Sequence, residues 1–101
     1  MKNNSLPVHI VATIKPKPRF YNEGVQALKR LLEPTRAEIG CIRFDVFEDE
    51  DRLQYVLVEH FNSQTDLEFH YEQPYTKSVF ALYETILEKA PEIHYLTPIV
   101  K

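Results

Sequence analysis

Three short segments of the chain alternate between hydrophobic and polar residues, which is the pattern of a β-strand with one buried face. The first, residues 8–15, is rich in β-branched residues and is followed by two prolines. Residues 41–48 and 53–61 alternate in the same way, with the acidic run 48–51 near their junction. This run is expected to be a solvated turn, so the two segments are predicted to form a β-hairpin.

The longest helical pattern covers residues 21–39, in which apolar residues recur at helical spacing. Gly40 follows it, at the place where a glycine ends many helices. Pro34 lies inside the pattern and removes one backbone hydrogen bond, so a kink or a break is expected between residues 30 and 34. The apolar stripe consists of Val25, Leu28, Leu31, Leu32 and Ile39.

Two further helices and a last strand are predicted downstream. Ser63, with Asp66 three residues later, is a capping-box-like start for a short helix that runs to Glu72 and stops at a proline. Residues 75–89 carry a second apolar stripe and end before another proline. Residues 92–100 are predicted to close the chain as a strand.

The predicted order of elements is β-α-β-β-α-β, which is the order of the ferredoxin-like split βαβ arrangement. In this α+β fold an antiparallel four-stranded sheet carries its helices on one face. Residues 7–100 are expected to form this single domain, and residues 1–6 a short N-terminal extension. Val11, Val56 and Val58 make the uncovered face apolar as well, and such faces usually bind a partner. We therefore expect a homodimer packed sheet against sheet.

Length, charge and composition narrow the classes of function. A chain of 101 residues buries one core and leaves room only for a modest gap between sheet and helices. The net charge of -3, without a basic stripe, makes nucleic acid and anionic membrane unexpected partners. No apolar run precedes the first strand, so neither a signal peptide nor a membrane span is expected and a cytoplasmic location is predicted.

The cysteine, glycine and histidine residues do not suggest a bound cofactor. A single cysteine, Cys41, forms neither an internal disulfide nor a CxxC pair and is expected to be a small core residue. The two glycines, Gly24 and Gly40, do not make a phosphate-binding loop. The four histidines lack HxH or HExxH spacing. No metal and no cofactor is therefore expected.

Residues 58–75 carry the candidate chemistry. Glu59 lies on an apolar strand and His70 on the helix that follows, so folding the helix back over the strand would bring a carboxylate and an imidazole to one pocket. An imidazole with a pKa of ~6.5 takes a proton from a phenol or from a carbon beside a carbonyl, and a facing carboxylate stabilises the imidazolium. A structural role remains open for each: His70 as a hydrogen-bonded core residue, and Glu59 as a partner of backbone or arginine. The predicted pocket walls are Leu57, Phe61, Leu67, Phe80 and Tyr83, with Tyr71 and Tyr75 at the rim.

Several short motifs follow one another along nearly the whole chain: residues 34–38 (PTRAE) before Gly40-Cys41, 43–46 (RFDV), Val58-Glu59 before Phe61, 67–70 (LEFH), and Pro74-Tyr75. In this order they resemble the antibiotic-biosynthesis-monooxygenase-like proteins of the dimeric α+β barrel superfamily. The resemblance implies a dimer with a pocket between sheet and helices in each subunit. It also implies oxidation of quinols or polyketide-like phenols by oxygen without metal or flavin, and it matches His70 and Glu59 to the family's helix histidine and strand glutamate.

The chain departs from two branches of that family. Anthrone-oxidising members use a strand asparagine, a tryptophan and a helix tyrosine, whose matching positions here are Leu57, Phe61 and Leu67, so the same substrate contacts are not expected. The haem-degrading relatives use an asparagine, a tryptophan and a histidine. This chain has no tryptophan, and the position of that histidine falls near Phe80, so haem degradation is not expected.

The expected function is therefore that of a cofactor-independent monooxygenase that oxidises a small phenolic or quinol-type compound with O2, assisted by a base. Two alternatives remain open. Residues 43–46 and 69–70 also resemble the branch that isomerises a phosphorylated dicarbonyl sugar derivative of autoinducer-2 breakdown, for which Lys77, Arg43 or Arg36 would have to bind the phosphate. The other alternative is a non-catalytic dimer that binds a small ligand, or only another protein. It predicts that Tyr83 and Phe80 fill the pocket or that His70 does not approach Glu59.

Overall fold

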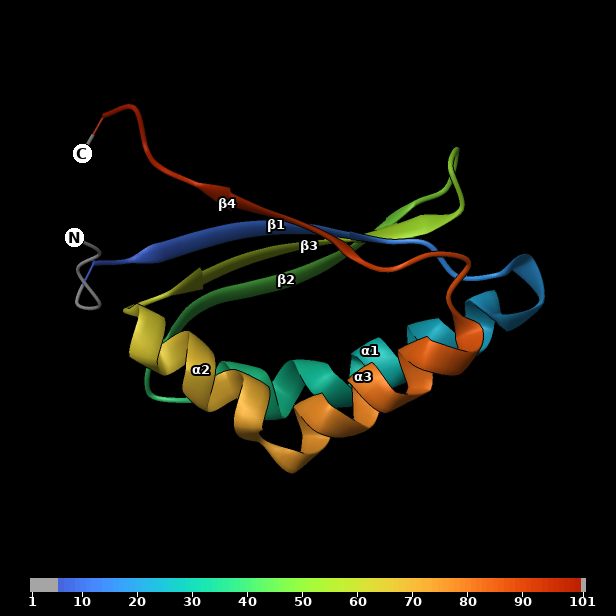
Figure 1. The fold of residues 1–101 in the computed structure, drawn as a ribbon, viewed down its shortest axis with the longest axis horizontal. Coiled ribbons are helices and arrows are strands. Elements are labelled where there is room, and N and C mark those ends of the chain that lie inside the picture. The colour runs from blue at the N-terminus through green and yellow to red at the C-terminus, as the bar shows by residue number, and fades with distance from the viewer. Residues whose placement is uncertain (1–5, 101) are drawn as a thin grey trace.

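The computed structural model of the protein describes residues 6–100, so five of the six residues of the predicted N-terminal extension lie outside the described residues. A four-stranded sheet forms one layer, and the helices form a second layer on one of its faces (Figure 1). The elements in chain order are β1 (Val8–Ile14), a 3-10 turn η1 (Pro18–Phe20), α1 (Tyr21–Arg36), β2 (Cys41–Asp49), β3 (Gln54–Phe61), α2 (Gln64–Glu72), α3 (Pro74–Ile86) and β4 (Glu92–Leu96).

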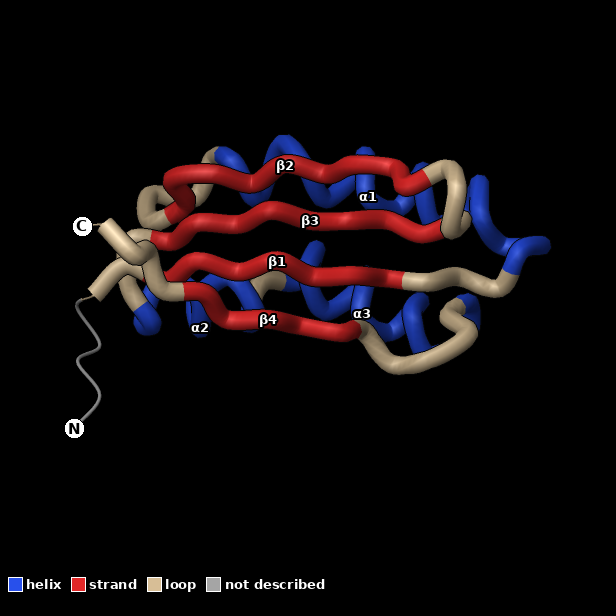
Figure 2. The backbone as a smooth tube through the Cα atoms, turned by 90° about the horizontal axis from the view of Figure 1, so that it is seen from above, coloured by secondary structure: helices blue, strands red, loops and turns tan. Residues whose placement is uncertain are grey.

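The strand order is β2-β3-β1-β4, and every neighbouring pair is antiparallel (Figure 2). This confirms the predicted α+β ferredoxin-like fold with an antiparallel four-stranded sheet. The β2–β3 hairpin turns at the acidic run, as the charge pattern predicted. In the described part of the chain, none of the helices is long and apolar enough to cross a membrane.

The pairing register decides which side chains face the helices. Ala12 on β1 stands opposite Leu57 on β3, and both side chains are buried beneath the helices. One residue further along, Val11 stands opposite Val58 on the uncovered face, where both are only half-buried. Because successive strand residues alternate between faces, Glu59 shares the helix-covered face with Leu57.

Of the predictions about α1, a break at Pro34 and a helix-ending Gly40 are wrong, whereas a kink stays a prediction. The helix continues through Pro34 without a break and ends at Arg36; Pro34 lies in its last turn, and Arg30, whose carbonyl loses the hydrogen bond, is exposed to solvent. Gly40 does not end the helix in the left-handed conformation, since its φ is not positive. It is needed for space instead: a Cβ there would lie 2.1 Å from Cγ of Asp66 at the start of α2.

The C-terminal elements are shorter than predicted. Helix α3 ends at Ile86 because the next residues pair with the chain after β1: Lys17 N donates to Ile86 O at 2.8 Å and Glu88 N donates to Lys15 O at 2.9 Å. Strand β4 ends at Leu96, which pairs with His9, one residue from the start of its partner strand β1. The predicted extension of this strand to residue 100 is therefore wrong.

Candidate functional site

A small cavity of about 30 Å³ lies between the sheet and the helices. That volume holds about one water molecule. Its walls include both predicted catalytic residues, Glu59 from β3 and His70 from α2. Of the predicted wall and rim residues, Leu57, Tyr71, Phe80 and Tyr83 line it, whereas Phe61, Leu67 and Tyr75 do not.

Glu59 is a buried carboxyl without a hydrogen-bond partner on one of its oxygens. The residue is 7% exposed, and its Oε1 is buried without a partner. Burial raises the pKa of this carboxyl from 4.5 to about 7, because the charged form loses its hydration. No ion pair to Glu59 occurs within residues 6–100. A carboxyl that titrates near neutral pH is suited to proton transfer.

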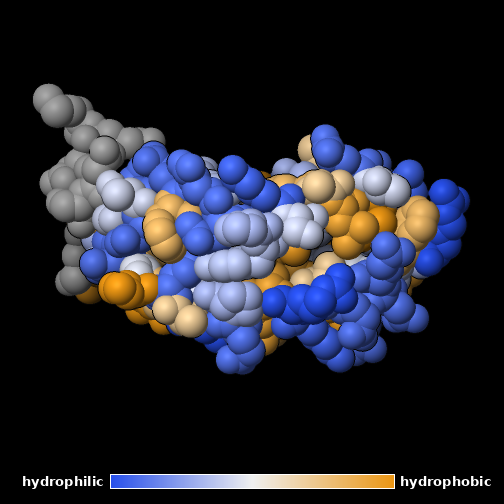
Figure 3. All heavy atoms as spheres, turned by 90° about the horizontal axis from the view of Figure 1, so that it is seen from below, coloured by the Kyte–Doolittle hydropathy of each residue, from blue (hydrophilic) through white to orange (hydrophobic). Residues whose placement is uncertain are grey.

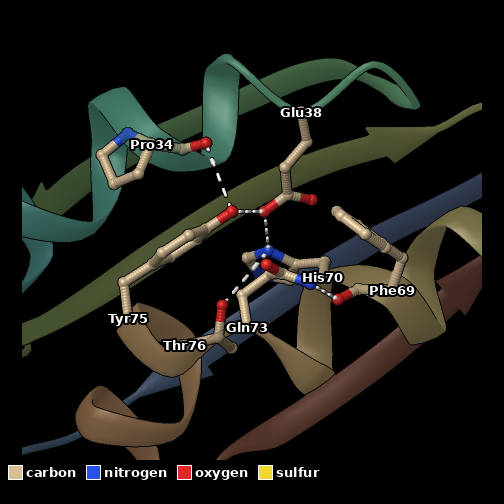
Figure 4. Close-up of polar contacts among 7 residues, drawn as sticks. All are labelled: Pro34, Glu38, Phe69, His70, Gln73, Tyr75 and Thr76. Atoms are coloured by element: carbon tan, nitrogen blue, oxygen red, sulfur yellow. Dashed lines mark hydrogen bonds and ion pairs between the residues drawn. The ribbon is translucent and has the colours of Figure 1, made fainter.

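His70 is held in place by the packing of α2 and by a second carboxyl. The helix begins where the Ser63 side chain accepts from Asp66 N at 3.2 Å, as predicted from the sequence. The His70 ring packs on the rings of Phe44 and Phe61, with centroids 5.7 and 5.2 Å away. Only 3% of the residue is exposed, and its Nδ1 lies 2.8 Å from Oε2 of Glu38 (Figure 4).

The carboxylate that contacts His70 is thus Glu38 and not Glu59. The same Oε2 also accepts a hydrogen bond from the Tyr75 hydroxyl at 2.5 Å. Our sequence reasoning placed Glu38 among the polar residues of the long helical pattern and missed this contact. The helical spacing of Leu31, Thr35 and Glu38, all of which are buried, could have indicated that Glu38 faces the interior, but not which residue it contacts.

Two tyrosines and a phenylalanine surround Glu59 on the helix side. Burial, followed by the nearby Glu59 charge, raises the pKa of both Tyr71 and Tyr83, so each keeps its hydroxyl proton. Phe80 packs edge-on against both rings, at 5.8 Å from Tyr71 and 5.6 Å from Tyr83. Phe80 is 38% exposed, so it forms part of the outer wall of the cavity.

Beyond this wall lies an open groove of about 660 Å³, which shares Phe80, Tyr83 and Pro91 with the cavity. In the view from the helix side, apolar side chains reach the surface in patches between polar ones (Figure 3). The groove and the cavity therefore share one wall.

The candidate phosphate-binding cations do not converge on this cavity. Arg36 and Arg43 both form ion pairs with Asp45, at 2.9 and 2.6 Å. Lys77 lines the outer groove. Only one of the three therefore borders the outer groove, and none lines the cavity.

The described side chains give little indication of a metal site or of a nucleophilic cysteine. Within residues 6–100, no group of three or more His, Cys, Asp or Glu side chains is arranged to hold a metal ion. Cys41 is half-buried, and burial together with the nearby carboxylate of Glu38 raises the pKa of its thiol to about 11. A thiol with such a pKa stays protonated and is a poor nucleophile at neutral pH.

The fold and the cavity define a class: small α+β proteins with a cavity between an antiparallel sheet and the helices on one of its faces. The family model of the antibiotic biosynthesis monooxygenases matches residues 7–82. The chain belongs to this family, which confirms the resemblance that its motifs indicated.

Individual relatives agree with this membership. The Mycobacterium tuberculosis protein "Putative monooxygenase Rv0793" is 29% identical over 93 residues, which cover 92% of each chain. Its solved structure matches 94% of this chain and 97% of its own, with a TM-score of 0.88 at 28% identity. The structure of PA3566 from Pseudomonas aeruginosa matches with a TM-score of 0.87 at 25% identity, over 98% of this chain and all (100%) of its own.

A protein of Synechocystis is 27% identical over 88 residues, which are 86% of this chain but only 55% of that protein. The chain therefore spans about half the length of this relative.

Proposed function

We propose that the protein is a cofactor-independent monooxygenase that oxidises a small phenolic or quinol-type compound with O2. The observation that carries the proposal is the presence, on one largely apolar cavity, of two proton-handling groups: the buried Glu59 carboxyl with a pKa of about 7 and the His70 imidazole. Membership in the antibiotic biosynthesis monooxygenase family supports oxygen chemistry. The motif resemblance to members that work without metal or flavin supports the cofactor-independent form.

His70 serves as the base in this proposal. With Nδ1 directed at Glu38, the other ring nitrogen of the neutral imidazole carries a free lone pair. This nitrogen removes a proton from the substrate. The resulting electron-rich anion passes an electron to O2, and the two radicals combine to a peroxide. Loss of water then leaves a carbonyl, so that a CH2 group and O2 become C=O and H2O.

Glu59 serves as the hydrogen-bond donor to the oxygen on which negative charge develops. A carboxyl with a pKa of about 7 is largely protonated at slightly acid pH and donates where an ordinary carboxylate would repel. The Tyr71 and Tyr83 hydroxyls, which also keep their protons, stand beside it. The apolar residues of the cavity keep water away from the anion and the peroxide.

The cavity has to widen for this reaction, because about 30 Å³ holds a water molecule but not an aromatic ring. Phe80 borders both the cavity and the outer groove, as Tyr83 and Pro91 do, and it is partly exposed, whereas Tyr83 is buried. We propose that Phe80 rotates outward when the substrate enters. The substrate then occupies both the cavity and part of the groove.

The second, uncovered face of the sheet supports the proposal of a homodimer. Half-buried Val11, Val56 and Val58 lie there together with Phe47, which is largely exposed. In the proposed dimer, the uncovered sheet faces of two copies pack against each other. Residues 7–100 form one domain in each subunit. Light scattering at micromolar concentration tests this, because a monomeric mass would contradict it.

Isomerisation of a phosphorylated dicarbonyl has less support, because two of its three candidate cations are occupied by Asp45. A non-catalytic ligand-binding role is favoured by two observations: the small volume of the cavity between Phe80 and Tyr83, and the pairing of His70 with Glu38 in place of Glu59. The experiment below separates this role from the enzyme.

Oxygen consumption by the metal-stripped protein with a panel of quinols and hydroxylated anthrones tests the proposal. We expect uptake by the wild type and a loss of about 100-fold or more in His70→Ala, because the base is removed. Glu68→Gln is the control: it changes an exposed side chain on the same helix that does not line the cavity, and its activity should equal the wild type's. Normal turnover by His70→Ala would exclude His70 as the base, and no uptake with any compound would favour the ligand-binding role.

A further inference from the structure

The turn between α1 and β2 places a glutamate inside the protein, directly next to the cavity histidine. Glu38 N donates to Thr35 O at 3.1 Å, and Cys41 N donates to Glu38 O at 3.1 Å, so the backbone of Glu38 is fixed on both sides. Ile39, its neighbour, points fully into solvent, whereas the Glu38 side chain is 4% exposed. The turn therefore directs one carboxylate inward.

This turn is also tied to the helix that carries His70. Gly40 packs so closely against Asp66 of α2 that a Cβ at position 40 would overlap with it, at 2.1 Å from Cγ. The carbonyl of Gly40 accepts from Asn62 N at 2.8 Å, just before α2 begins. The carboxylate and the imidazole are thus held at a fixed separation by backbone contacts and not only by their own hydrogen bond.

The hydrogen bonds of Glu38 determine which nitrogen of His70 carries the proton. Tyr75 keeps its proton, because burial and then the hydrogen bond to Glu38 raise the pKa of its hydroxyl, so Tyr75 is a donor to Oε2. The second contact of Oε2 is Nδ1 of His70 at 2.8 Å. A carboxylate oxygen that accepts from both groups requires a proton on Nδ1. Figure 4 shows Oε2 between the two donors, and the Thr76 hydroxyl near the same Nδ1, at 3.4 Å.

The side chains of His70, Glu38 and Tyr75 together extend from the cavity to the surface of the protein. His70 borders the cavity that also contains Glu59. Glu38 and Tyr75 border a different hollow on the surface, formed by the α1–β2 turn and the C-terminal half of α2. Glu38 therefore never touches a molecule in the cavity and acts only through His70.

We propose that Glu38 is the positioning residue of this site: it holds His70 in the tautomer whose free lone pair serves the cavity, and it stabilises the imidazolium that forms when His70 accepts a proton. Tyr75 has a supporting role, because its hydroxyl fixes the orientation of the carboxylate. The proposal rests on the proposed function, in which His70 is the base, and it adds two residues that do not line the cavity.

Nuclear magnetic resonance of protein labelled with ¹⁵N in histidine tests the tautomer without any substrate. Two-bond ¹H–¹⁵N correlations at pH 8 report which ring nitrogen bears the proton, and the His70 signals are identified by their loss in His70→Ala. We expect the Nδ1–H form in the wild type. The Nε2–H form would overturn the proposal, whether or not the protein oxidises a quinol.

Oxygen uptake by three variants tests the effect on catalysis. Glu38→Gln keeps the shape but presents an amide that no longer fixes the tautomer, so kcat should fall about 100-fold with little change in KM. Glu38→Asp keeps the charge and should recover part of that loss, and Tyr75→Phe should lose less than Glu38→Gln while keeping the Nδ1–H form. Unchanged kcat and tautomer in Glu38→Gln would overturn the proposal. If wild type consumes no oxygen with any substrate, the proposed function fails, and the wild-type spectrum alone decides the role of Glu38.

Discussion

Two glutamates are buried within reach of the same cavity wall, and their surroundings differ. Glu38 has two donors on Oε2, a histidine and a tyrosine, and its position is fixed by a tight turn, although its Oε1 is buried without a partner. Glu59 is buried on a strand, with Oε1 lacking any partner and with a pKa raised to about 7. Buried carboxyls normally find partners, so the paired glutamate is the ordinary case. The unpaired one is the group whose burial calls for a functional explanation.

Removing the paired carboxyl should have the largest effect on stability. Glu38→Ala removes the short hydrogen bonds of the His70 Nδ1 and the Tyr75 hydroxyl and leaves them only the contacts at 3.4 Å with Thr76 Oγ1 and Pro34 O, which should lower the free energy of unfolding by about 3–5 kcal/mol. Urea denaturation measures this, with Glu33→Ala as the control at an exposed position of α1. A loss no greater than that of the control would mean that the two hydrogen bonds contribute little.

Removing the charge of the unpaired carboxyl should instead raise the free energy of unfolding, and only at higher pH. The pKa of Glu59 is about 7 in the folded protein and 4.5 in the reference state, so the folded state binds its proton more tightly and stability falls as pH rises through this range. Between pH 4.5 and pH 8 the wild type should lose up to about 3 kcal/mol relative to Glu59→Gln.

Denaturation series at several pH values measure this difference. Glu68→Gln, at an exposed position on α2, is the control and should follow the wild type. Parallel curves for wild type and Glu59→Gln would contradict the proposed burial of an unpaired carboxyl.

The smallest expected effect is on KM, because we expect substrate to enter past the Glu59 cavity wall and not beside Glu38. Phe80 forms the wall between the Glu59 cavity and the outer groove, whereas Phe69 borders the surface hollow beside Glu38. Phe80→Ala should lower the KM for bulky quinols about tenfold, which corresponds to about 1.4 kcal/mol, because the cavity becomes open. Phe69→Ala should leave the KM unchanged. Equal behaviour of the two variants in steady-state kinetics would argue against entry past Phe80.

Part of the site and most of the fold could be predicted from local patterns in the sequence. Alternation placed Leu57 and Glu59 on the same face of a strand, and the Ser63 cap located the start of the helix that carries His70. These are local patterns, so the shared cavity of Glu59 and His70 could be anticipated. The fold followed from the order of the same elements and from the resemblance of their motifs.

The contact between Glu38 and His70 could not be found in this way. The two residues are 32 positions apart, and their meeting depends on how the α1–β2 turn packs on α2 through Gly40 and Asp66. The end of α3 at Ile86 has a similar origin, because its cause is pairing with Lys17, far away in the chain. Long-range contacts of this kind leave little trace in the local pattern of hydrophobic and polar residues.

The pH dependence of kcat/KM for oxygen uptake, compared between wild type and Glu59→Gln, tests most directly whether the unpaired carboxyl is the functional one. The glutamine amide donates a hydrogen bond at every pH, whereas Glu59 loses its donor proton near pH 7. We predict that the activity of the wild type falls above about pH 7 and that Glu59→Gln remains active at higher pH. The same alkaline decline in both proteins would contradict the assignment of Glu59 as the hydrogen-bond donor of the cavity.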